Sequence, residues 1–313
     1  MTMSLHGREL EDPELVTLHW NDGGPDRQAL DLIARAARAD AEMSFGPDLR
    51  HPSYERAFLT AQVYTRLRRW NAPRAKGPAL AAVITLTSPS ECGPIVIDAV
   101  VDPDFRSTGV ITAAFETLGQ SPPEQLDAGG RSVAACAYGS HPAALRTANR
   151  FGAQVNAVRD VLVLPSKDDN LRSRLPSGSV HFRAVPTDNA VGGERQQMAW
   201  RLVDGDTPRP LYAATHRETG DVAGFFALED RGGATRLVVL GPSVPAAEDE
   251  TALRGIVGAA LPLLWDREDG IVESVVEQTD VLLLETLRSA SFQHDRTDVV
   301  FESDLVRKKI PSS

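Results

Sequence analysis

The feature that most constrains the fold of this chain is an internal repeat. Shifting the sequence by 139 positions aligns residues 98–161 with residues 237–300 without a gap. Twelve of these 64 aligned positions are identical, where average residue usage would give roughly four. The identical pairs include Pro103/Pro242, Thr112/Thr251, Gly119/Gly258, Val133/Val272 and Leu145/Leu284. We infer that one structural module occurs twice in tandem.

The pattern within each copy is that of a mixed α/β module, because short apolar runs alternate with stretches of helical periodicity. In the first copy we expect strands at 15–19, 62–69, 78–87, 94–102, 131–138 and 158–164, and helices at 26–40, 112–118 and 142–151. A polar stretch bearing proline and serine follows, and the order then repeats. The pattern predicts an N-terminal module at 1–164, a linker at 165–179 and a C-terminal module at 180–313.

Composition excludes several classes of protein. The 313 residues suit about two domains, and a net charge of −10 argues against a nucleic-acid-binding surface. No apolar run approaches the roughly 20 residues that span a bilayer, and the acidic N-terminus does not resemble a signal peptide. The two cysteines, Cys92 and Cys136, cannot form a disulfide framework, and no cluster has metal-ligand spacing. We expect a soluble, cytoplasmic protein that binds neither membrane nor nucleic acid.

An apolar strand followed by Pro-x-x-Arg-x-x-Gly, a helix, and then strand–helix–strand resembles the GNAT acetyltransferase fold. The segments "AVVDPDFRSTGV", "AYGSHPAALRTANRFGA" and "VEQTDVLLLETLRSASF" are similar to segments of the mycothiol synthase family, which also carries two such modules. The resemblance implies an α/β fold of two tandem GNAT-like modules, each a mixed twisted sheet flanked by helices. It also implies an acyl-CoA-dependent N-acetyltransferase that transfers acetyl to an amine of a small molecule.

The resemblance places acetyl-CoA at the start of the helix that follows the fourth strand. Backbone amides at a helix N-terminus favour a diphosphate, and the pantetheine arm pairs with the strand edge as an added peptide strand does. The implied cofactor-binding residues are Val100, Val101, Arg106, Ser107, Thr108, Gly109, Val110 and Ile111. Ile111 stands where the family has a small residue, so its side chain either crowds the phosphate or packs between helix and sheet.

The second copy departs further from the family pattern. Under the 139-residue shift, Pro245-Ala246-Ala247-Glu248-Asp249-Glu250 replaces the segment from Arg106 to Ile111. Carboxylates suit a helix N-terminus, but they repel a diphosphate, by about 4 kcal/mol for unit charges ~4 Å apart at an effective dielectric near 20. We therefore expect acetyl-CoA in the N-terminal module only.

Amine acetylation needs a base for the ammonium proton and often an acid for the leaving thiolate. Members of the family use a carboxylate on the fourth strand and a tyrosine on the helix after the fifth strand. In the second copy these positions resemble Arg236 and Leu287, neither of which transfers protons near neutral pH. In the first copy Asp98 takes the carboxylate position, and Tyr138 at the end of the fifth strand substitutes for the missing tyrosine. The alternative is that Asp98 is a half-exposed strand residue and Tyr138 a packed aromatic.

A different class of function stays open on the same residues. The degenerate motifs also fit a protein that has lost catalysis and serves as an acyl-CoA sensor or as a scaffold that binds another ligand or protein. Cys136, on the fifth strand, is either an acyl acceptor or a core residue. The sequence leaves open whether the chain forms a homodimer and which amine it binds.

Overall fold

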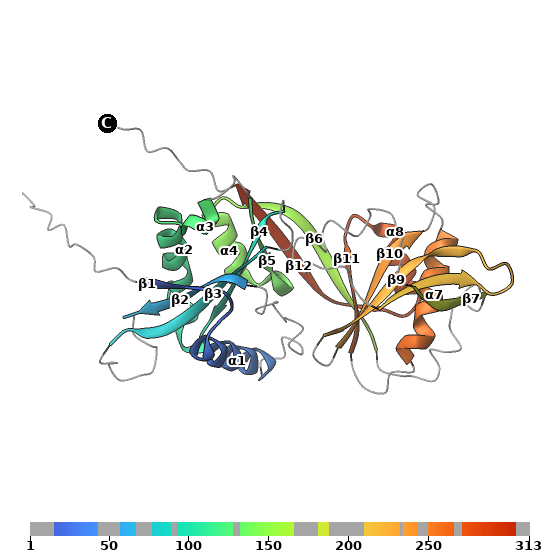
Figure 1. Ribbon diagram of the computed structural model, residues 1–313, viewed down its shortest axis with the longest axis horizontal. Coiled ribbons are helices and arrows are strands. Elements are labelled where there is room, and N and C mark those ends of the chain that lie inside the picture. The colour runs from blue at the N-terminus through green and yellow to red at the C-terminus, as the bar shows by residue number, and fades with distance from the viewer. Residues whose placement is uncertain are drawn as a thin grey trace, which may run out of the picture.

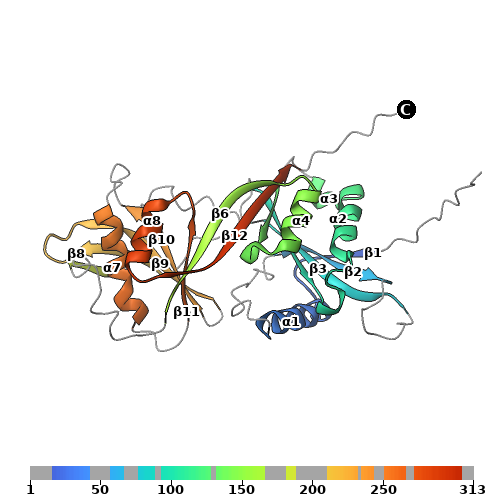
Figure 2. The same ribbon diagram turned by 180° about the vertical axis from the view of Figure 1, so that it is seen from behind.

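The computed structural model describes residues 16–42, 57–66, 77–88, 93–127, 132–165, 181–187, 210–231, 234–242, 250–265 and 271–304. Its described strands form one twelve-stranded sheet in the order β1-β2-β3-β4-β5-β12-β6-β11-β10-β9-β8-β7. The two halves lie side by side along the long axis, joined by β6 and β12 (Figures 1 and 2). The α/β class and the paired architecture expected from the repeat are confirmed.

The N-terminal half is a sheet with helices on both faces. Its elements are β1 (Val16–Asp22), α1 (Arg27–Glu42), β2 (Ala57–Thr65), β3 (Ala79–Thr87), β4 (Ile95–Val101), η2 (Pro103–Phe105), α2 (Val110–Gln120), α3 (Glu124–Asp127), β5 (Ser132–Ala137), η3 (Tyr138–Ser140) and α4 (Pro142–Arg150). Helix α2 buries Val110, Ala114 and Leu118 in a cluster with one face of β1–β4. Helix α1 buries Ala29 and Leu32 against the opposite face (Figure 1).

The C-terminal half repeats this order. It contains β7 (Phe182–Thr187), β8 (Leu211–His216), β9 (Val222–Arg231), β10 (Ala234–Pro242), α7 (Glu250–Trp265), β11 (Ile271–Glu277), α8 (Val281–Ser289) and β12 (Gln293–Asp304). Helix α7 is far more deeply buried than its counterpart α2, with nine buried residues from Leu253 to Leu264. It shares one apolar cluster with α8 and with strands β8–β11.

The last strands of the two halves are exchanged. Strand β6 (Gln154–Leu164) ends the first copy, yet it pairs with β11, while β12, which ends the second copy, pairs with β5. The two exchanged strands also pair antiparallel with each other at the centre of the sheet. The boundaries 1–164, 165–179 and 180–313 stay a prediction for the order along the chain. In space, each half of the sheet includes a strand from the other copy.

Most expected elements lie within a few residues of the observed ones, with one clear difference. The second strand, expected at 62–69, is β2 at Ala57–Thr65. Its first residues, including Leu59 and Ala61, are buried in the sheet, and the strand ends before the arginine-rich run that begins at Arg66. The predicted linker beyond Pro165 lies outside the described residues.

Strands β4 and β5 separate after a short parallel contact. Their register contains only Ile95↔Val133 and Val96↔Ala134, although β4 continues to Val101 and β5 to Ala137. On its other side β4 stays paired with β3 as far as Val101. The edge of β4 from Ile97 to Val101 is therefore unpaired on the side of β5, and α2 begins after the short loop that follows the end of β4.

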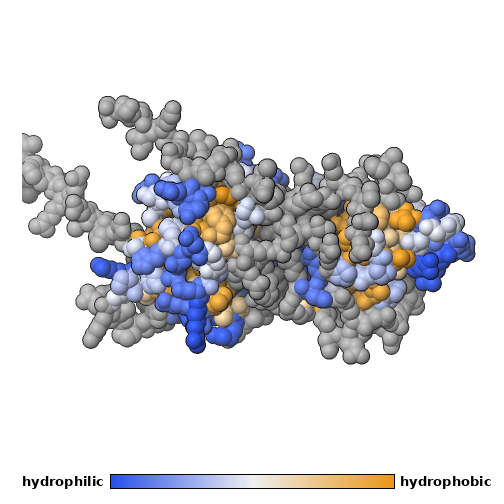
Figure 3. All heavy atoms as spheres, viewed as in Figure 1, coloured by the Kyte–Doolittle hydropathy of each residue, from blue (hydrophilic) through white to orange (hydrophobic). Residues whose placement is uncertain are grey.

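Hydrophilic and hydrophobic side chains are interspersed over the described part of the face seen in Figure 3, in both halves of the molecule. Among the described residues the large apolar side chains that are exposed are scattered over several elements, from Leu30 on α1 to Val281 on α8. Scattered apolar side chains of this kind are normal on a protein surface. No helix among the described residues is long and apolar enough to cross a membrane.

Candidate functional site

The loop between β4 and α2 turns sharply before the helix begins. Asp102 is 3% exposed and caps η2, because its side chain accepts a hydrogen bond from the Asp104 amide at 3.0 Å. Two residues of the loop have left-handed backbone, Ser107 at φ 63° and Gly109 at φ 87°. Glycine adopts this conformation without the steric cost that a side chain brings, which explains why Gly109 is the glycine present in this turn.

The first amides of α2 have no side-chain cap. Gly109 is the N-cap residue and supplies no side-chain hydrogen bond. Among the described residues, the amides of Val110, Ile111 and Thr112 have no hydrogen-bond acceptor, whereas the Ala113 amide donates to the Gly109 carbonyl at 3.0 Å. Unpaired amides at a helix start bear partial positive charge and suit an anion. A Cβ at Gly109 would meet nothing within 4 Å, so the approach to the turn is open.

Ile111 packs between helix and sheet. Its side chain is half-buried and contacts the apolar cluster that α2 forms with β1–β4. Of the two alternatives for this position, the contact with the cluster favours packing over crowding of a bound phosphate.

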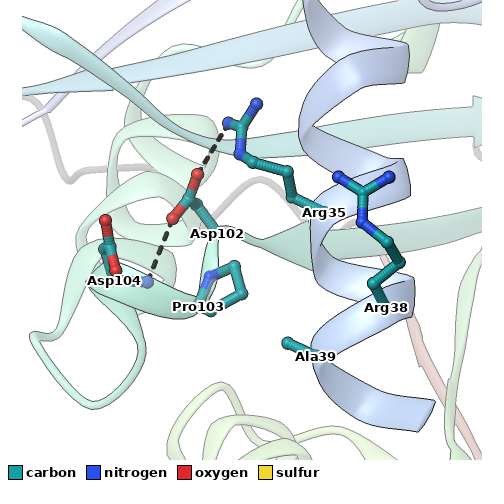
Figure 4. A pocket seen from close by; sticks show the side chains of 6 residues that line it. All are labelled: Arg35, Arg38, Ala39, Asp102, Pro103 and Asp104. Atoms are coloured by element: carbon teal, nitrogen blue, oxygen red, sulfur yellow. Dashed lines mark hydrogen bonds and ion pairs between the residues drawn. The ribbon is translucent and has the colours of Figure 1, made fainter. Parts of the chain in front are cut away.

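Two ion pairs link helix α1 to the same loop. In one the arginine is on the loop, and in the other it is on the helix. Arg106 donates from Nη1 to Asp40 Oδ1 at 2.6 Å, and Arg35 donates from Nη2 to Asp102 Oδ2 at 2.8 Å. A cavity of about 240 Å³ lies between α1 and η2 at this contact, lined by Arg35, Arg38, Ala39, Asp102, Pro103 and Asp104 (Figure 4). The loop and α1 therefore form one electrostatically linked unit.

Asp98 and Tyr138 lie on neighbouring strands at the opening. Asp98 is half-buried near the middle of β4, and its Oδ1 accepts from the Ala99 amide at 3.0 Å. It lies on the same sheet face as Val100, which packs against the cluster of α1. Tyr138 is half-buried and begins η3, directly after the last residue of β5. Both residues thus border the opening between β4 and β5.

Cys136 is held as a neutral thiol. Burial raises the pKa of its thiol to about 12, opposed by the nearby Arg159 guanidinium and supported by the carboxylates of Asp298 and Asp98. Arg159 Nη2 lies 3.5 Å from the sulfur. A thiol with a raised pKa is a poor nucleophile at neutral pH, so this environment argues against Cys136 as an acyl acceptor, and the half-buried residue packs within the sheet.

The corresponding region of the C-terminal half is filled by a buried ion pair. Arg236 donates from Nε to Glu273 Oε1 at 2.8 Å, with side chains 8% and 0% exposed. A second guanidinium, that of Arg296, lies 3.8 Å from Glu273 Oε2. Leu287, at the position of the family tyrosine, is fully buried in the apolar core. The carboxylate of Glu273 on β11 therefore already has two arginine side chains beside it.

The start of α7 keeps an acid that the alignment singled out. Glu250 begins α7 and forms an ion pair with Arg254 one turn later. The remainder of the acidic segment, Pro245 to Asp249, lies outside the described residues. Among the described residues no group of histidine, cysteine and acidic side chains could hold a metal ion.

Three residues of this region were not singled out in the sequence: Asp40, Arg159 and Asp298. Asp40 lies 66 residues from Arg106, and no local pattern connects the two. Arg159 and Asp298 are each at most 5% exposed. Arg159 lies in a largely apolar strand, where a charge without a partner is rare, and this is the signal that could have found it. Asp298 follows the polar first residues of β12, so no local pattern marks it.

Comparison with known proteins agrees with this geometry. No family model matches the chain. A mycothiol acetyltransferase of Clavibacter sepedonicus is 28% identical, over 66% of this chain and 72% of its own length. A tandem GNAT protein from the clavulanic acid biosynthesis pathway superposes with a TM-score of 0.61, at 16% identity, covering 95% of this chain and all of its own. A GCN5-related N-acetyltransferase from Sphaerobacter thermophilus gives a TM-score of 0.54, at 14% identity, with 94% and 96% covered. These similarities confirm both the tandem GNAT fold and the resemblance to acetyltransferases.

Proposed function

We propose that this chain, which has a tandem GNAT fold and resembles a mycothiol acetyltransferase, is an acetyl-CoA-dependent N-acetyltransferase. Its substrates are acetyl-CoA, bound by the N-terminal module, and an amine of a small molecule. The observations that carry the proposal are the uncapped start of α2, with Gly109 in left-handed backbone, and the unpaired edge of β4 that precedes this loop. The similarity in sequence and fold supports the same assignment.

Each part of acetyl-CoA has a matching feature. The amides of Gly109, Val110 and Ile111, with Ser107 and Thr108 in the preceding turn, form the cradle for the diphosphate, and Arg106 adds a positive charge. The edge of β4 at Val100 and Val101 receives the pantetheine arm, because it is not paired with β5 there. The thioester then reaches the level of Asp98, between the two strands.

The chemistry assigned to the protein is proton transfer. Asp98 accepts the proton of the acceptor ammonium, so that the free amine attacks the thioester carbonyl. The C–S bond of the thioester breaks as the new amide C–N bond forms, and Tyr138 protonates the departing thiolate of CoA. The C–terminal half takes no part in these steps, since its equivalent region is occupied by Arg236 and Glu273.

The proposal is tested by ligand-dependent stability followed by a transfer assay. Acetyl-CoA at about 100 times its Kd should stabilise the chain by roughly 2.7 kcal/mol, and acetylation should then be detected with a panel of small amines. Stabilisation without transfer to any amine would instead support an acyl-CoA sensor or a binding scaffold. Absence of stabilisation by every CoA ester would contradict both.

A further inference from the structure

We propose that Asp40 of α1 is a positioning residue for the diphosphate of CoA, acting through Arg106. This inference deepens the proposed function and rests on it. It concerns a contact between two segments far apart in the sequence, and it assigns a role to a helix that lies on the opposite face of the sheet from α2 (Figure 1).

The guanidinium of Arg106 is held through two of its three nitrogens. Its Nη1 donates to Asp40 Oδ1 at 2.6 Å, and its Nε donates to the Val101 carbonyl at 3.4 Å. Among the described residues no acceptor is found for Nη2, and the side chain is 32% exposed. An arginine has five N–H donors in a rigid plane. Two of its nitrogens therefore fix the plane, and the remaining donors are left to a ligand.

The location of Asp40 is unfavourable for α1 taken alone. It lies in the last turn of the helix, where the macrodipole favours a cation, and that turn contains no basic residue. The contact with Arg106 offsets this local cost. An acidic residue that is unfavourable at the end of its own helix, but forms an ion pair with a proposed binding residue of another element, is typical of a functional arrangement.

The second ion pair of α1 supplies an internal comparison. Arg35 and Asp102 link the same helix to the same loop at 2.8 Å, but Asp102 is buried and its other carboxylate oxygen caps η2 (Figure 4). Breaking this pair loosens α1 without releasing Arg106. The Arg35 contact thus reports on docking of the helix, whereas the Asp40 contact reports on positioning of the Arg106 guanidinium.

The test compares Asp40→Asn with Arg35→Gln by titration with CoA and with pantetheine, which lacks the diphosphate. Asp40→Asn should weaken binding of CoA roughly three- to tenfold, since an unrestrained arginine must be ordered when the ligand binds, and should leave pantetheine binding unchanged. Arg35→Gln should leave the affinity for both ligands within about twofold of wild type. In an Arg106→Gln background, Asp40→Asn should no longer alter CoA affinity, which a merely structural role would not predict.

Each other outcome overturns the inference. Unchanged CoA affinity in Asp40→Asn would show that the carboxylate does not prepare Arg106, and tighter binding would show that it competes with the diphosphate. If Asp40→Asn does not fold, Asp40→Glu, which keeps the charge but alters its reach, replaces it with the same expected direction. Failure of wild-type protein to bind CoA would instead contradict the proposed function.

Discussion

Arg159 and Asp298 occupy the same position in the two copies of the module and lie directly opposite each other in the sheet. They are separated by the 139 residues of the repeat, and they are register partners in the antiparallel pair of β6 and β12. The axis that relates the two copies therefore passes beside this pair. A duplicated position has become a cation in one copy and an anion in the other.

The surroundings of Asp298 predict a large loss of stability on its replacement. Its Oδ1 accepts from the Gly139 amide at 2.7 Å and lies 3.5 Å from Arg296 Nε, and its side chain is 4% exposed. Asp298→Ala should lower the free energy of unfolding by about 3–5 kcal/mol, because it leaves buried charge uncompensated. The matched control is Asp295→Ala, since Asp295 also pairs with Arg296 but is 41% exposed, and it should cost less than about 1 kcal/mol. Equal losses in urea unfolding would refute this prediction.

The buried pair of Arg236 and Glu273 should behave as structure and not as catalytic machinery. Glu273→Gln should destabilise the chain by about 3–5 kcal/mol, whereas Arg236→Met combined with Glu273→Leu should be close to neutral, because the cost of burying the charges disappears with them. Acetyl transfer by the folded double variant should match that of wild type. Loss of transfer with the fold intact would place the chemistry in the C-terminal half.

The fold could be predicted from the sequence to the level of the module, but the pairing of its last strand could not. Apolar and polar side chains alternate along β6 and β12 in the same way whether each strand pairs within its own half or crosses to the other. The periodicity of the sequence therefore carries no information on the exchange. The alignment of the copies also fails locally. A register shift between Val239 and Gly241 places Val239 in the cluster under α7, whereas its aligned partner Val100 faces α1.

The candidate site could be predicted where it is local in sequence. The turn from Arg106 to Ile111 is one continuous segment, so its left-handed Gly109 follows from the motif. The partner of Arg106 could not be predicted in this way, because Asp40 is brought to it only by the packing of α1 on the sheet.

The raised pKa of Cys136 predicts how stability changes with pH. Burial holds the folded-state pKa at about 12, above the ordinary value of 9.0. The folded state therefore keeps a proton that the unfolded state has lost between these values. The stability that this thiol contributes is fully present below pH 9 and should fall by about 1.4 kcal/mol per pH unit above it. Urea unfolding from pH 8 to 10.5 should show this slope in a Cys92→Ser background, and a further Cys136→Ala change should flatten it. An equal slope in both proteins would contradict the assignment.

Charge reversal at Arg106 should remove the binding of CoA. Arg106→Glu replaces a cation with a carboxylate, which repels the diphosphate of CoA and also repels Asp40. We expect no stabilisation by CoA at concentrations that stabilise wild type, measured by thermal unfolding. The control is Glu250→Lys at the start of α7 in the other half, which should keep the full stabilisation. Retention of CoA binding by Arg106→Glu would disprove the placement of the diphosphate.

Replacement of Asp98 should separate binding from chemistry. Asp98→Asn keeps the size of the side chain and its acceptor for the Ala99 amide, but it cannot take a proton. If Asp98 is the base, kcat should fall about 10²–10⁴-fold, while CoA should stabilise the variant as it does wild type, because the diphosphate contacts lie beyond the end of β4. Tyr138→Phe should lower kcat less when the leaving group is a more acidic thiol than CoA, since such a thiolate needs no proton to depart. An Asp98→Asn protein with unchanged kcat would assign the base to another residue and leave Asp98 as a strand carboxylate.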